Sequence, residues 1–253
     1  MQILGAVCWR TWLKTARRPV VLTFSFVQPI MWILFFGFLF QRFDVGLVLH
    51  GVRYLDFLVP GVCAMTVLFG ASQSGIGLIR DMQTGFLQRL FASPANPGVV
   101  LCGKILADVA RLLAQAVAIG LLGLVVGAKL HLTVAGVMTS LLALGLFAIG
   151  FCSLSCLVAM LTGAQESMAT FVHLVNMPLL FTSSALVPAR QMPDWLAAIS
   201  RVNPLTLAVD ATRDALLLGE FGSLRLALML LAAVAIVLLA VAWTTARGLR
   251  RED

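Results

Sequence analysis

Long apolar runs separated by short polar stretches are the dominant pattern of this chain. A helix needs about 20 apolar residues to cross the hydrocarbon core of a bilayer, and six runs match this length. They cover residues 20–40, 58–79, 104–127, 133–161, 168–187 and 226–246. Apolar and polar positions do not alternate within them, as they would in membrane strands. The pattern predicts an all-α integral membrane protein with six transmembrane helices in a single domain, residues 1–253.

Composition supports the membrane class and argues against other classes. The chain is 60% hydrophobic and only 11% charged, whereas an average soluble domain has about 25% charged residues. The net charge of +7 is spread between apolar runs, so we interpret it as a topology signal and expect no nucleic-acid partner. Cys152 and Cys156 are one helical turn apart, but no His or acidic residue is spaced to complete a metal site with them.

Basic residues near the ends of the runs predict the orientation. Cytoplasmic flanks of membrane proteins are enriched in Lys and Arg, and the densest basic cluster, at residues 10–18, directly precedes the first run. Six spans place both termini on one side of the membrane. We therefore expect both termini and the segment 81–98 to be cytoplasmic, and the segment 188–222 to be extracytoplasmic.

Residues 1–18 precede the first run and have an amphipathic pattern. Apolar residues fall on one side, and basic residues recur three and four positions apart. This pattern predicts an N-terminal amphipathic helix that lies in the membrane interface, with its basic residues toward anionic head groups. A positively charged flank that only fixes the topology would carry the same charges.

The segment 188–222, between the last two runs, is long for a loop and half apolar. Pro188, Pro193 and Pro204 interrupt it, so it cannot form a full span. Irregular backbone at membrane depth is tolerated only where protein or water covers it. We expect re-entrant or interfacial helices here; a structural lid over the bundle is the simpler alternative.

The segment 81–98, between the second and third runs, carries an apolar face of its own. Phe86, Leu87, Leu90 and Phe91 share one side of a short helix. Gly85 permits a sharp entry, and two prolines end the helix. Such a helix fits its apolar face into a groove on a partner protein; the alternative is an interfacial helix that touches only lipid.

Three blocks of sequence carry a family pattern. The first is RDMQTGFLQRLFASPANPGVVLCGK, the second is GKILADVARLLAQA, and the third is SSALVPARQMPDWLAAISRVNPLTLAVDATR. The first is similar to a cytoplasmic segment of the TGTLERLLxTP kind followed by Gly-Lys, and the third contains VP, MPxWL, NPxT and DxxR in order. With these blocks the chain resembles the membrane subunit of ABC-2 type exporters, most closely the daunorubicin-resistance type of permease.

The resemblance implies a function and a set of partners. It implies a permease in the bacterial plasma (inner) membrane that forms a homodimer, contacts membrane lipid, and binds two ABC ATPase subunits. The expected substrate is amphipathic or hydrophobic, either a drug-like molecule or a lipid. Gln88 stands where the family often has Glu, and Phe86 where it often has Thr. This difference weakens the case for an ionic contact at position 88 but leaves the apolar contacts.

Site residues follow from the resemblance and from the positions of polar residues. The expected ATPase coupling residues are Thr84, Gly85, Phe86, Leu87, Arg89, Leu90, Phe91 and Pro94. The expected substrate path contains Phe24, Gln28, Phe36, Ser72, Gln73 and Asn176. The expected extracytoplasmic gate contains Pro188, Met192, Pro193, Trp195, Asn203, Pro204, Asp210 and Arg213. Interhelical hydrogen bonds and lipid-facing aromatic residues would explain the path residues equally well.

Asp108 and Arg111 are opposite charges three residues apart inside the third run. Ionisable residues in a membrane span are costly and usually face protein or water. We expect an intramembrane charge pair with a mainly structural role. A gate or a proton carrier is the functional alternative.

The sequence contains no nucleotide-binding motif of the GxxxxGK[ST] kind. LCGKIL has a Gly-Lys, but it lacks the upstream Gly and the Ser or Thr that would hold phosphate and magnesium. We therefore expect a transport subunit that is not an enzyme and has no cofactor, with ATP and Mg²⁺ on a partner ATPase.

Other functions remain as alternatives. An ABC exporter of a lipid-linked oligosaccharide or polysaccharide would have the same architecture. A proton-driven secondary transporter would favour an unpaired acidic residue at mid-depth and an inverted repeat, and a membrane enzyme would favour clustered His and acidic residues. Neither of these last two patterns is found in the sequence.

Overall fold

The computed structural model describes residues 19–40, 52–85, 97–218 and 224–248, and all regular structure in these ranges is helical. The long helices are α2 (Pro19–Leu39), α4 (Tyr54–Gln83), α6 (Pro97–Val126), α7 (Val134–Thr162), α8 (Gln165–Phe181) and α11 (Leu224–Gly248). Short elements lie between α8 and α11: η1 (Ala189–Gln191), α9 (Asp194–Val202), α10 (Pro204–Arg213) and η2 (Asp214–Leu218).

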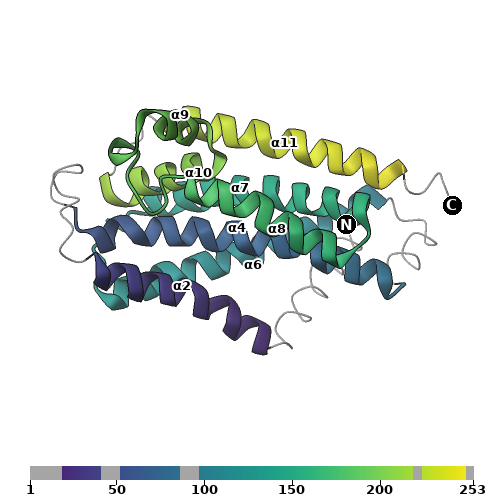
Figure 1. Ribbon diagram of the computed structural model, residues 1–253, viewed down its shortest axis with the longest axis horizontal. Helices are drawn as coiled ribbons and strands as arrows, with labels where there is room; N and C mark the ends of the chain where they lie inside the picture. The colour runs from purple at the N-terminus through teal and green to yellow at the C-terminus, as the bar shows by residue number, and fades with distance from the viewer. Residues whose placement is uncertain (1–18, 41–51, 86–96, 219–223, 249–253) are drawn as a thin grey trace.

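The long helices lie alongside one another along the longest dimension of the molecule (Figure 1). Helices α9 and α10 lie at the end of the bundle where α4 begins, and α4 ends at the opposite end (Figure 1). Four helices among the described residues are long and apolar enough to cross a membrane, namely α4, α6, α7 and α11. The remaining two predicted spans correspond to α2 and to α8, which has 17 residues, and the six-span topology stays a prediction.

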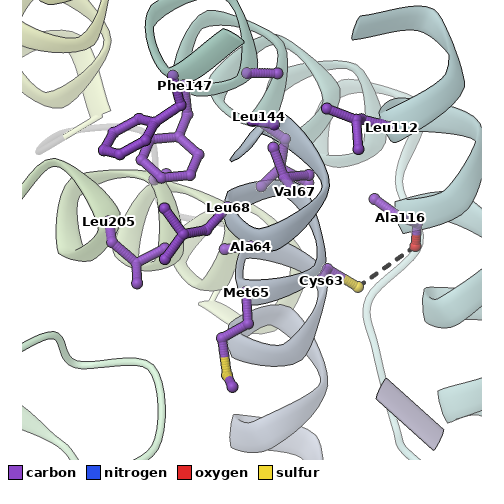
Figure 2. Packing of buried hydrophobic residues seen from close by; sticks show 14 of the residues in the cluster. Cys63, Ala64, Met65, Val67, Leu68, Leu112, Ala116, Leu144, Phe147 and Leu205 are labelled. Atoms are coloured by element: carbon purple, nitrogen blue, oxygen red, sulfur yellow. Dashed lines mark hydrogen bonds between the residues drawn. The ribbon is translucent and has the colours of Figure 1, made fainter. Parts of the chain in front are cut away.

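Helix α4 lies at the centre of the bundle. It contacts α2, α6, α7, α8 and α10. In the most apolar 18-residue stretch of α4, 83% is buried inside the protein, whereas the corresponding value for α11 is 17%. Figure 2 shows how Ala64 and Leu68 of α4 lie among side chains from α6, α7 and α10. Every other long helix is therefore positioned directly or indirectly by α4.

Local sequence signals explain several helix ends. The hydroxyl of Thr133 accepts a hydrogen bond from the Gly136 N–H and caps α7, and the Asn203 side chain caps α10 at the Leu205 N–H. These two side-chain caps mark where α7 and α10 begin. Helix α6 includes residues 97–103, which precede the predicted span beginning at residue 104.

Helix α8 ends at Phe181, although the predicted span continued to residue 187. Pro178 lies inside α8, and residues 182–188 have no regular helical structure. The predicted interfacial helix at residues 1–18 and residues 86–96 of the 81–98 segment lie outside the described residues.

Close approach between α4 and α7 depends on Gly75. A Cβ atom at this position would overlap the Ser155 carbonyl oxygen and hydroxyl and the Met168 side chain. The absence of a side chain lets two helices approach closely, as is common in membrane bundles.

We expect Gly75→Ala to destabilise the protein because overpacking against backbone cannot be relieved by a rotamer change. The expected cost is about 1–3 kcal/mol, measured as a lower melting temperature in mild detergent. Gly120→Ala is the matched control, because the atom nearest to the new Cβ, Cys63 Sγ, would lie 3.9 Å away, which is an ordinary contact distance. Equal melting temperatures for the two variants would contradict the close approach.

Candidate transport site

Polar side chains buried in the bundle gather at separate levels along α4. Hydrocarbon offers no hydrogen-bond partners, so each of these groups must be satisfied within the protein. No buried side-chain nitrogen or oxygen among the described residues lacks a hydrogen-bond partner. The arrangement of these bonds shows which helices are joined to one another.

The Lys104 cluster consists of Ser74 on α4 and Lys104 and Asp108 on α6. Lys104 Nζ lies 2.7 Å from Asp108 Oδ2, and it also donates to the Ser74 carbonyl (2.9 Å) and the Ser74 hydroxyl (3.0 Å). The Ser74 hydroxyl donates to Asp108 Oδ2 at 2.5 Å. Lys104 and Asp108 are 9% and 7% exposed, so a buried ion pair joins α4 to α6.

This geometry corrects the predicted pairing of Asp108 with Arg111. Arg111 instead donates to the Gly70 carbonyl at 3.4 Å. Spacings of three and four residues both place side chains on the same helix face. The contact with Ser74 on α4 fixes Asp108 on the side of Lys104, so the partner four residues away forms the ion pair.

A second group of polar contacts joins α4 to α7 and α8. The Ser155 hydroxyl donates to the Ser72 carbonyl at 2.8 Å and accepts from the Gly75 N–H at 3.0 Å. Asn176 Nδ2 donates to the Ser72 hydroxyl at 2.8 Å. Ser72 and Asn176, which the sequence assigned to the substrate path, are therefore buried and bonded to each other.

The Arg213 cluster joins α10 to the start of α4 and to the irregular backbone after α8. Arg213 donates from Nε to the Phe57 carbonyl (3.1 Å), from Nη1 to the Ser184 carbonyl (2.8 Å) and from Nη2 to the Ala185 carbonyl (2.8 Å). Its guanidinium carbon also lies 3.4 Å from the centroid of the Phe57 ring. A single arginine thus satisfies three backbone carbonyls that come from two different segments.

Asp210 completes the Arg213 cluster. It accepts a hydrogen bond from the Ser184 hydroxyl at 2.7 Å and lies 3.4 Å from Arg213 Nη1. Burial lowers the pKa of the Arg213 guanidinium to about 10, and the Asp210 charge acts against that shift. Arg213 is therefore still charged at neutral pH and keeps all its donors.

At the same end of the bundle, a polar clamp joins α4 to the segment after α6. Arg53 pairs with Asp56 at 2.8 Å and donates to the Gly127 carbonyl at 2.6 Å. Asp56 also accepts from the Lys129 N–H at 2.6 Å. Helices α4 and α6 are thus bonded near both ends of the hairpin that they form.

Helix α2 is attached to α6 at a proline. Pro29 lies inside α2 and has no N–H to donate to the Ser25 carbonyl four residues earlier. Gln115 Nε2 of α6 donates to that carbonyl at 3.0 Å. The glutamine therefore supplies the donor that the proline lacks.

The predicted coupling residues are only partly described. Thr84 ends α4, with its N–H donating to the Arg80 carbonyl, and Gly85 adopts a φ of 67° that favours glycine. The sharp turn expected at Gly85 is therefore present. Phe86, Leu87, Arg89, Leu90, Phe91 and Pro94 lie outside the described residues.

The other predicted path residues occupy different environments. Gln28 on α2 and Gln73 on α4 are exposed. Phe36 stacks on Trp32 at 4.8 Å between ring centroids and on Phe40 at 5.8 Å. The side chain of Phe24 lies outside the described residues.

The predicted gate residues divide into bonded and exposed groups. Asn203 Nδ2 donates to the Leu179 carbonyl (2.8 Å), and Asn203 is followed by Pro204, the first residue of α10. Asp210 and Arg213 form the cluster described above. Pro188 is buried and Met192 half-buried, whereas Pro193 and Trp195 are exposed. The structure thus bonds Asn203 to the last turn of α8, bonds Asp210 and Arg213 to the irregular stretch after α8, and leaves Trp195 at the surface.

Several residues of these clusters were not singled out from the sequence. Lys104 is the lysine of the Gly-Lys in the first block, and no ion pair was predicted for it, although its spacing of four from Asp108 was a usable signal of one. Arg53 and Asp56 are three residues apart, which was also a usable signal of a pair, but their bonds to the segment after α6 are long-range. Ser184 and Gln115 bond to distant segments, and no local pattern distinguishes them from ordinary polar residues.

The long apolar helices, with buried polar groups satisfied inside the bundle, define a multi-pass helical membrane protein. The model of the ABC-2 type transporter family matches residues 2–217, and the chain belongs to this family. This membership confirms the resemblance inferred from the three sequence blocks.

The chain is similar to several transport permeases. It is 32% identical over 215 residues to the transport permease ycf38 of Cyanophora paradoxa, covering 84% of this chain and 73% of that protein. It is 27% identical over 206 residues to the daunorubicin resistance ABC transporter permease DrrB1 of Streptomyces coeruleorubidus (81% and 72% covered). It is 25% identical over 203 residues to the doxorubicin resistance permease DrrC of Mycobacterium tuberculosis (79% and 71% covered).

We expect Arg213→Ala to destabilise the protein strongly, because it leaves buried carbonyls without a donor. Each such carbonyl costs about 1–3 kcal/mol, and thermal unfolding in detergent measures the sum. Arg201→Ala is the control, because Arg201 is exposed on α9. Similar melting temperatures for both variants would contradict the role given to Arg213.

We expect a double-mutant cycle to reveal the dependence of Gln115 on Pro29. Gln115→Leu alone leaves the Ser25 carbonyl without this donor and costs about 1–3 kcal/mol. In the Pro29→Ala background, residue 29 supplies its own N–H, so the added Gln115→Leu change is expected to have little effect. Thermal unfolding of the four proteins measures the coupling, and equal effects of Gln115→Leu in both backgrounds would refute it.

Proposed function

We propose that this chain is the permease subunit of an ATP-driven exporter in the bacterial inner membrane. The substrate is an amphipathic or hydrophobic molecule, either drug-like or a lipid. The observation that carries the proposal is the family match over residues 2–217, together with relatives named for daunorubicin and doxorubicin resistance. ATP hydrolysis takes place on separate ATPase subunits, two for each pair of permeases, because this sequence has no GxxxxGK[ST] motif.

The contact with the ATPase is assigned to the cytoplasmic segment between α4 and α6. Helix α4 ends at Gln83, and Gly85 turns the chain before the apolar residues Phe86 and Leu87. Helix α4 then extends, over 30 residues, back to the Arg213 cluster. At about 1.5 Å per residue this is roughly 45 Å, so a displacement of the segment is carried along the whole bundle.

A second copy of the chain and the substrate path are assigned to the face formed by α2, α4 and α8. Gln28, Gln73 and His173 are exposed there, one on each helix. In contrast, every exposed residue of α11 from Leu226 to Val241 is apolar. Polar residues exposed at membrane depth face protein or water rather than lipid. This contrast supports a homodimer in which the α2–α4–α8 face lines the path and α11 faces lipid.

The proposal is tested by changing the apolar face of the coupling segment. Leu87→Asp would bury an unpaired carboxylate in a groove that accepts an alkyl group, which costs several kcal/mol. We expect normal membrane levels, because residue 87 lies outside every predicted span, together with loss of ATPase co-purification and transport. Recovery of the ATPase at matched expression is the decisive measurement.

Gln88→Glu is the matched control for this experiment. The family often carries Glu at this position, so this variant is expected to retain both the ATPase and transport. Unchanged ATPase recovery and unchanged transport with Leu87→Asp would mean that the segment only contacts lipid.

A further inference from the structure

The ion pair in the Lys104 cluster occupies an unusual position for a charged group. It lies inside two apolar helices, and its two charged residues are nearly excluded from solvent. Taking charges out of water is costly, and apolar residues of similar volume often stabilise a fold at least as well as a buried ion pair. Stability alone is therefore a weak reason for the pair.

The cluster has a directional geometry that apolar packing would not provide. Lys104 Nζ reaches three acceptors, two of them on Ser74 of the neighbouring helix, and the Ser74 hydroxyl donates back to Asp108. These contacts, at 2.5–3.0 Å, fix both the height and the rotation of α6 against α4. Nearer the middle of the two helices, the contact from Arg111 to the Gly70 carbonyl is longer, at 3.4 Å.

A second fixed point lies at the other end of the same hairpin. There Asp56 accepts from the Lys129 N–H, and Arg53 donates to the Gly127 carbonyl. Asp56 and Ser74 are both on α4, 18 positions apart, and this separation corresponds to about 27 Å along the helix. Two fixed points this far apart prevent sliding and also prevent one helix from pivoting on the other.

We infer that Ser74, Lys104 and Asp108 are positioning residues that make α4 and α6 move as one body. These are the two helices that the proposed coupling segment connects, so a displacement of that segment reaches the Arg213 end through both helices together. Without the cluster, α4 and α6 separate at the coupling end, and ATPase motion is absorbed between them. This inference rests on the proposed coupling to an ATPase.

The test replaces the cluster with apolar residues of similar size: Ser74→Ala, Lys104→Met and Asp108→Leu together. The variant is studied as the full chain with its ATPase subunits in lipid vesicles, with daunorubicin and a fluorescent phospholipid as the transport probes. We expect an unchanged or higher melting temperature, full ATPase recovery and continued ATP hydrolysis. Transport per ATP hydrolysed is expected to fall about tenfold. Ser140→Ala is the control, because its buried hydroxyl bonds only within α7, to the Gly136 carbonyl.

A second measurement does not depend on knowing the substrate. Spin labels at the exposed positions Gln83 on α4 and Leu106 on α6 report the distance between the helices, without nucleotide and with a trapped nucleotide. We expect one narrow distance distribution in both states for the native cluster, and a broad or nucleotide-dependent distribution for the triple variant. Ser74→Ala alone, which keeps the ion pair within α6, is expected to broaden the distribution less.

The outcomes separate this inference from the proposed function. If the unmodified permease recovers no ATPase, the proposed function fails, and the distance measurement still decides whether the cluster holds the helices together. If the unmodified permease binds the ATPase, and the triple variant keeps a narrow distance distribution or the native transport ratio, the inference is overturned. It is also overturned if transport falls only in proportion to the amount of folded protein, because the cluster is then purely structural.

Discussion

The need to satisfy every polar group within the protein is the constraint on which this structure depends. Helix α4 is almost completely surrounded by other helices, yet it carries Asp56, Ser72 and Ser74. Each of these residues bonds to a different neighbour: the segment after α6, helix α8, and helix α6 itself. In hydrocarbon an unsatisfied group costs several kcal/mol, so these bonds fix where the neighbours lie.

The same constraint explains how the chain tolerates irregular backbone between α8 and α10. Residues 182–188 are not helical, and their carbonyls cannot rely on the i→i+4 bonds of a helix. Arg213 donates to the carbonyls of Ser184 and Ala185, and the Tyr54 hydroxyl donates to that of Leu186. Gly61 makes this possible, because a Cβ atom there would overlap the Ala185 carbonyl. The irregular backbone at this end of the bundle is therefore held by side chains from α4 and α10.

The sequence predicted the elements better than the contacts between them. Four of the six apolar runs correspond to helices long enough to span a membrane, because length and hydropathy are properties of a local segment. The helix ends differ from the predicted span ends: α8 ends at Phe181, before residue 187, and α6 includes residues 97–103. The partner of Asp108 was predicted incorrectly, because Arg111 lies three and Lys104 four residues away, and both spacings place side chains on the same helix face. Only the position of Ser74, which is 34 residues away, decides between them.

The distribution of polar bonds also bears on which helices move together. Between apolar helices in lipid there is little hydrophobic driving force, so packing and directional bonds determine how firmly two helices are joined. Helix α4 has such bonds to α6, α7, α8 and α10. In the described part of the chain, α11 packs closely on α7 but makes no side-chain hydrogen bond to another helix. The polar bonds thus join α6, α7, α8 and α10 to α4 as one bonded unit. Helix α11 is joined to this unit by apolar packing on α7.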